Sequence, residues 1–182
     1  MNRQFCLWIL TVIVIASGVS SGRTKAIFSN YIALTTFDGL LDNNLSEVFC
    51  DANNVIWVGT QFGLQVYDGG LFYTFPYTGV NSLSGNNIRG IISLDKEHLV
   101  VGTEMGISRI NIYNYQIKNL VFQTDNEIFE KVNRTQQLKL TKDSQIVVVA
   151  TGGVHLVSHD LQFRHSWVFD KEEFRSVGIT CV

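Results

Sequence analysis

A repeat with a period of 43 residues constrains the fold of this chain more than any other feature. Segments 57–64 (WVGTQFGL) and 100–107 (VVGTEMGI) share a frame of two apolar residues, Gly-Thr, two variable residues, Gly and an apolar residue. The repeated positions are Asn44, Trp57, Gly59, Thr60 and Gly63 in the first copy, and Asn87, Gly102, Thr103 and Gly106 in the second. A period of this length indicates one supersecondary unit that stacks on copies of itself.

Two further copies follow and are less regular. Segment 148–154 (VVATGGV) keeps the threonine and the second glycine but has lost one residue between them. The wider spacing from the second copy predicts an insertion at about residues 126–133. A fourth copy begins near Phe174 and breaks off at Val182.

Each unit has room for four short strands separated by turn-forming residues. We expect strands at 47–51, 55–60, 64–67 and 72–75 in the first unit, and at 88–94, 99–103, 107–112 and 116–122 in the second. Four strands in about 40–45 residues is the size of one β-propeller blade. The sequence therefore predicts an all-β fold of antiparallel blades at about 37–80, 81–125 and 126–173, with the start of another at 174–182. Residues 31–36 are expected to form an outer strand.

The repeated Gly-Thr pair is expected to have a structural role. The first glycine, Gly59 in the first copy, would allow a sharp turn because it has no Cβ atom. The hydroxyl of Thr60 would bond to nearby backbone, and Gly63 would begin the next strand. Trp57 is expected to fill the space between blades, which is the usual role of a buried aromatic side chain.

Residues 1–22 have the layout of a secretory signal peptide. Arg3 is the only charge before an apolar run at 5–16, and small residues follow. The run is shorter than the roughly 20 residues that a membrane-spanning helix needs, so cleavage is favoured over anchoring, and both over a buried N-terminal helix. The predicted location is therefore exported, in a periplasmic or other extracytoplasmic compartment, with the remaining domain at 23–182.

The charge restricts the possible partners of this chain, and the cysteine content bears on whether it forms a disulfide bond. Fourteen basic and sixteen acidic side chains give a formal net charge of -2, which argues against a nucleic-acid partner because such partners need a clustered basic surface. Cys50 and Cys181 remain after the signal, each in an expected strand, where cysteine packs as a small hydrophobe. Two free buried thiols are favoured over a disulfide bond, which an oxidising compartment would permit.

The first copy resembles the two-component regulator propeller repeat, and the resemblance extends over roughly residues 28–182. The matching positions are Asp38-Gly39-Leu40, Asn43-Asn44, Asp51, Trp57-Val58-Gly59-Thr60, Gly63-Leu64 and Tyr67-Asp68. The second copy departs at Val100, where that family has tryptophan, and the third copy is degenerate.

This resemblance implies the N-terminal part of an extracytoplasmic sensor that binds a carbohydrate or other small molecule, without catalysis in this segment. Any histidine kinase activity would lie in a downstream segment. The alternative is an exported propeller scaffold that binds a protein or a polysaccharide with no signalling role. Three and a half blades are too few to close a ring, so we expect partnership with further blades or self-association through open strand edges.

The sequence offers few groups for chemistry. His155 and His159 are four residues apart, a metal-binding spacing only on a helix, and they fall near a strand; His98 and His165 have no neighbouring ligands. No metal, cofactor or catalytic residue is predicted. Phe62 and Met105 occupy the variable pair of the Gly-Thr loops and are candidate ligand contacts on one rim. For Phe62, packing against a neighbouring loop is favoured over contact with a ligand.

Overall fold

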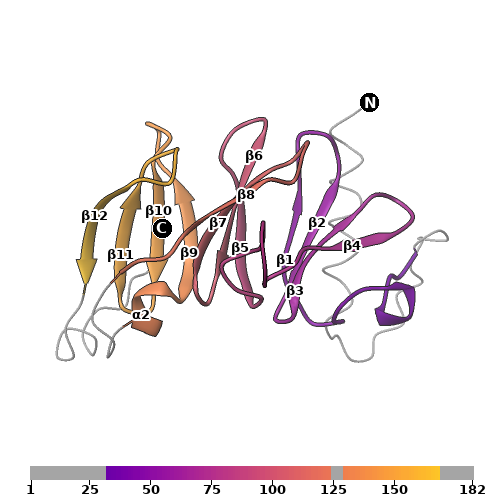
Figure 1. Cartoon of the computed structure of the whole chain (residues 1–182). Helices are drawn as coiled ribbons and strands as arrows, with labels where there is room; N and C mark the ends of the chain where they lie inside the picture. Colours follow the sequence, from indigo (N-terminus) through magenta and orange to yellow (C-terminus); the bar gives the residue numbers. More distant parts are fainter. Residues whose placement is uncertain (1–31, 124–128, 169–182) are drawn as a thin grey trace, which may run out of the picture.

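The computed structural model describes residues 32–123 and 129–168. The expected signal peptide at 1–22 and the start of a further blade at 174–182 lie outside these ranges. The described chain folds into three four-stranded antiparallel sheets, in each of which consecutive strands are neighbours. Figure 1 shows the three sheets side by side across the molecule.

The first three strands of each sheet contain five or six residues, and the fourth strand varies in length. The first contains β1 (Leu45–Cys50), β2 (Ile56–Thr60), β3 (Gly63–Tyr67) and β4 (Phe72–Thr74). The second contains β5 (Ile88–Ser93), β6 (His98–Thr103), β7 (Gly106–Asn111) and β8 (Ile117–Leu120). The third contains β9 (Thr135–Leu140), β10 (Ile146–Ala150), β11 (Gly153–Val157) and β12 (Phe163–Val168). The predicted all-β fold of four-stranded blades is confirmed.

The first strands of successive sheets lie next to each other, β1 beside β5 and β5 beside β9. This is the arrangement of inner strands in a propeller, with the later strands of each sheet lying farther out. The second sheet lies between the other two, so its middle strands β6 and β7 are covered on both faces. That arrangement explains why β6 is apolar along most of its length.

Two apolar clusters join the sheets. The cluster between the first and second sheets is built around Trp57, which is fully buried. Its ring stacks on Phe75, with 5.3 Å between centroids, and meets the edge of Tyr115 at 6.1 Å. The indole Nε1 donates to Asp51 Oδ2 at 2.9 Å, so the buried polar atom has a partner. The second cluster joins the second and third sheets and includes Val100, Ile107, Val148 and Val157.

The first glycine of the repeat packs between blades and does not form a turn, so that expectation was wrong. Gly59 lies within β2, and a Cβ atom there would be 2.6 Å from Cγ2 of Ile88 in the second sheet. Gly102 repeats this in β6, where a Cβ atom would be 2.5 Å from Cγ2 of Thr135 in the third sheet. Each glycine therefore makes room for the first residue of the next blade.

The expected outer strand at 31–36 is also not found in the described residues. Residues 32–35 carry no regular structure, and Thr36–Asp38 form a short 3-10 helix, η2. Thr35 and Asp38 form a capping box, in which the Asp38 side chain accepts from the Thr35 backbone at 2.8 Å. Gly39 then ends the turn with a φ of 100°. These local hydrogen bonds favour the turn over an extended strand.

The segment between the second and third sheets contains a short helix, α2 (Phe129–Asn133). It falls inside the predicted insertion. Asn133 is buried, and its side chain both accepts from Phe122 N at 2.7 Å and donates to Phe122 O at 2.9 Å. This pair of bonds fixes the end of the second blade against the helix.

Cys50 is the last residue of β1, partly exposed, and disulfide-bonded. The expectation of a free buried thiol was wrong. Because β1 is the edge strand of its sheet, its final residue is not enclosed by neighbouring strands. Among the helices of the described segments, none is both long enough and apolar enough to cross a membrane.

Candidate functional site

The two rim candidates from the sequence lie in equivalent tight turns. Phe62 lies between β2 and β3 and is 54% exposed, so most of its ring is not packed against a neighbouring loop. Met105 lies between β6 and β7 and is half-buried. The turns present both side chains on the same edge of successive blades, but no described contact joins one to the other.

The threonine and the second glycine of the repeat shape these turns. Thr60 Oγ1 donates to Gly63 O at 3.1 Å and accepts from Phe62 N at 3.1 Å. Thr103 makes the same pair of bonds in the second blade, with Gly106 O at 3.1 Å and Met105 N at 3.0 Å. Both threonines are fully buried. The hydroxyl thus fixes the turn from inside, as the sequence predicts.

The inner strand of every sheet has a β-bulge at the same place. On each of β1, β5 and β9, one residue after the first has no partner in the pairing with the next strand. The bulged residues are Ser46, Arg89 and Gln136. A bulge redirects a side chain relative to the regular alternation of a strand. Each inner strand therefore has one bulge, which presents one polar side chain.

Two of these bulged residues border one cavity between the first and second blades. The cavity has a volume of about 200 Å³ and is partly open to solvent. Its lining consists of Asn44, Leu45, Ser46, Gln61, Asn87 and Arg89. Asn44 and Asn87, the repeated asparagines, occupy equivalent positions just before β1 and β5. Five of the six lining residues are polar, so the cavity suits a ligand with several hydrogen-bonding groups.

Arg89 is the single charged residue in that lining. Its Nε atom is buried, and no described residue accepts a hydrogen bond from it. No carboxylate among the described residues forms an ion pair with its guanidinium group. Buried cationic groups are normally paired because desolvation without a partner is unfavourable. Arg89 itself is only partly buried, and its Nε is the one buried side-chain nitrogen or oxygen of the described residues that has no hydrogen-bond partner.

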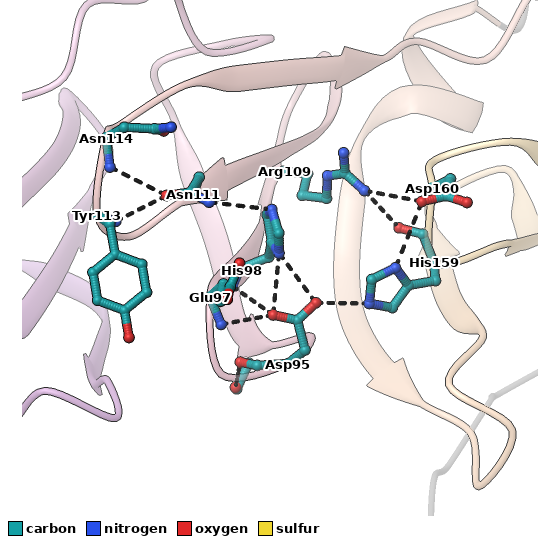
Figure 2. A network of polar contacts seen from close by, with 10 residues as sticks. Asp95, Glu97, His98, Arg109, Asn111, Tyr113, Asn114, His159 and Asp160 are labelled. Atoms are coloured by element: carbon teal, nitrogen blue, oxygen red, sulfur yellow. Dashed lines mark hydrogen bonds and ion pairs between the residues drawn. The ribbon is translucent and has the colours of Figure 1, made fainter.

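A second polar group joins the second and third blades. Asp95, in the turn before β6, accepts from His159 Nε2 at 2.7 Å across the blade boundary, and both of its oxygens lie 3.1 Å from His98 Nδ1. Arg109 on β7 reaches the same turn of the third blade, donating to His159 O at 3.1 Å. Figure 2 shows His98 and His159 approaching the Asp95 carboxylate from the two blades, while Arg109 reaches His159 O and Asp160.

The Asp95 carboxylate is stabilised in its charged form. Partial burial acts to raise its pKa, but the backbone N–H of Glu97 and the two histidines outweigh burial and hold the pKa below its usual value. Within residues 32–123 and 129–168, no cluster of three or more His, Cys, Asp or Glu could hold a metal ion. We interpret the group as a clasp between blades.

His155 is buried in the third sheet. Its ring stacks on Phe122 at 3.9 Å between centroids. The contact of Nε2 with Val132 O at 2.9 Å requires Nε2 to donate, so Nδ1 accepts from Ser166 Oγ at 2.7 Å. Burial is the main cause that lowers the pKa of His155, and both ring nitrogens are already used. The residue is a neutral core histidine.

Sequence reasoning found the repeated asparagines but missed Arg89 and the Asp95 clasp. Arg89 occupies a position where the first blade has serine, so no repeat signal marks it. His98 and His159 are 61 positions apart, and only the stacking of two blades brings them to one carboxylate. The only available signal would have been the general expectation that polar side chains of neighbouring blades meet where the blades stack.

Comparison with known proteins supports the fold. No protein-family model and no curated protein matches the chain. Its structure is similar to the extracellular domain of the hybrid two component system BT3049 from B. thetaiotaomicron, with a TM-score of 0.54 and 17% identity over 69% of this chain. It is also similar to the extracellular domain of the hybrid two component system BT4673 from B. thetaiotaomicron, with a TM-score of 0.51 and 23% identity over 69% of this chain.

This chain corresponds to only a small part of those domains. It covers 17% of the BT3049 domain and 15% of the BT4673 domain. At these identities the likeness establishes a shared fold. The described residues therefore form three blades that resemble part of the extracellular domains of two-component systems.

Proposed function

We propose that this chain supplies blades of a ligand-sensing β-propeller in an exported signalling protein, and that it acts by binding. The observation that carries the proposal is its structural likeness to the extracellular domains of two hybrid two-component systems. The signal-like segment at 1–22 supports an extracytoplasmic location. Any kinase chemistry would belong to a different segment of the same signalling protein.

The polar cavity between the first two blades supports binding. The cavity lies where the starts of two neighbouring inner strands meet, and Gln61 from the turn after β2 completes its lining. The described residues bring together no metal cluster, and the two histidines of the clasp are bonded to one carboxylate. These observations favour a binding module over an enzyme.

The gene itself provides the first test. We expect the reading frame beyond Val182 to continue through more blades into a membrane span and a histidine kinase. In that full-length protein, replacing this chain's blades should abolish ligand-dependent phosphorylation while leaving basal kinase activity measurable. A stop codon directly after Val182 would reject the signalling role and favour an exported scaffold that binds a protein or a polysaccharide.

A further inference from the structure

We propose that the cavity between the first and second blades binds a carboxylate-bearing sugar, with Arg89 as the residue that recognises the carboxylate. This inference deepens the proposed sensing function and rests on it. The site and the carboxylate of the ligand are supplied by neither the repeat signature nor the fold likeness.

The guanidinium of Arg89 has donors available for a ligand. Within the described residues it has neither a hydrogen-bond acceptor nor an ion-pair partner, and its Nε atom is shielded from water. A guanidinium presents a planar set of donors that matches the two oxygens of a carboxylate. A carboxylate bound in the cavity would supply the acceptors that the protein does not.

Three of the other four polar side chains of the cavity are also available. The hydroxyl of Ser46 and the side-chain amides of Asn44 and Asn87 make no hydrogen bond with the described residues, although all three border the cavity. Hydroxyl and amide groups can donate and accept, which suits the hydroxyl groups of a sugar. A volume of about 200 Å³ is below that of most drug-binding pockets, so the cavity favours a single small ring.

Nearby carboxylates do not compete for Arg89 because they are engaged elsewhere. Asp42 accepts from Gln61 Nε2 at 3.2 Å and from Asn44 N at 3.0 Å. Glu104 accepts from Asn87 N at 2.8 Å and from Asn86 N at 3.3 Å. These bonds fix the loops that carry the asparagines, and neither carboxylate forms an ion pair with Arg89.

The bulges explain how one cavity receives side chains from two strands. Ser46 and Arg89 are at equivalent positions of β1 and β5, each the extra residue of its bulge. Because β1 and β5 are adjacent, the two bulges place these side chains at the same boundary. The backbone therefore positions Arg89 without any side-chain partner, as expected for a residue whose partner is a ligand.

The test compares sodium D-glucuronate with D-glucose, which differ mainly in the carboxylate. Calorimetric titration of the full chain should detect glucuronate and give at least tenfold weaker binding of glucose. Arg89→Gln should weaken glucuronate binding by about 10- to 100-fold, the range for a lost charge-assisted hydrogen bond. Arg164→Gln is the matched control, because it removes an equal charge from an exposed position on β12 and should leave binding unchanged.

A measurement on the unaltered protein removes any dependence on variant folding. In a ¹⁵N–¹H spectrum, the Nε–H resonance of Arg89, assigned with Arg89→Lys, should shift on addition of glucuronate and not on addition of glucose. Equal binding of both sugars, or equal losses in Arg89→Gln and Arg164→Gln, would overturn the carboxylate site while leaving the sensing function intact. The absence of glucuronate binding to the unaltered chain, with no Arg89 shift, would also overturn it.

Discussion

Gly59 lies against Ile88 so closely that a Cβ atom on the glycine would be 2.6 Å from Cγ2 of the isoleucine. The contact joins the middle of one blade to the first strand of the next, and the repeat produces it again at Gly102 and Thr135. The first glycine of the Gly-Thr pair, which the first two copies share, is therefore explained by stacking between blades.

Gly59→Ala should destabilise the chain by about 1–3 kcal/mol, the usual effect of overpacking. Combining it with Ile88→Ala should cost less than the sum of the two single changes, because the smaller side chain removes the clash. Urea unfolding of the four proteins measures this coupling. Gly90→Ala is the control, since a Cβ atom there would have no neighbour within 4 Å; a loss as large as that of Gly59→Ala would contradict the explanation.

Thr60→Val should destabilise the first blade by about 1–3 kcal/mol. The change keeps the shape of the side chain but removes the hydroxyl, leaving Phe62 N and Gly63 O without their partner. Thr60→Ser keeps the hydroxyl and should lose much less stability. Thermal unfolding compares the two variants, and similar losses would show that the methyl group matters more than the hydrogen bonds.

Acidification should destabilise the third sheet through His155. Its pKa is lowered in the folded protein by burial, so the unfolded chain binds a proton more readily as the pH falls below about 6.5. The free energy of unfolding should therefore decrease between pH 7 and pH 5. His155→Gln should show a shallower decrease over this range, whereas His165→Gln, at an exposed position, should keep the original slope.

Glu47→Gln should stabilise the protein at pH 7. Burial raises the pKa of Glu47 despite the opposing hydrogen bond from Val48, so its charged form is unfavourable in the fold. The expected gain is below about 1 kcal/mol, because a partly buried carboxylate still reaches water. The gain should vanish below pH 4.5, where the glutamate is protonated in both states. A gain that persists at pH 3.5 would have another cause.

The blade pattern was predictable because local rules determine it. Turn residues such as Asn54 and Gly106, which have positive φ, separate the apolar segments that form strands. Both the turn residues and the apolar segments can be recognised in the sequence. The first glycine was misassigned because its constraint comes from Ile88 in a different blade. The turn at Thr36–Asp38 was missed because a capping box overrode the extended pattern.

The candidate site was much less predictable than the fold. Asn44 and Asn87 were visible as repeated positions, but their meeting at one cavity depends on how two blades stack. Arg89 has no counterpart in the first blade, where Ser46 takes its place. A single sequence does not reveal whether a side chain has a hydrogen-bond partner in the folded protein.

Hydrogen exchange measured by mass spectrometry tests the central claim, that these blades bind a small ligand, most directly. The full chain would be compared with and without mixtures of soluble neutral and acidic sugars. We predict slower exchange in peptides that cover 44–50 and 87–93, with β12 unchanged as an internal reference. If no mixture slows exchange in these two peptides, the account of this chain as a ligand-binding propeller segment is contradicted.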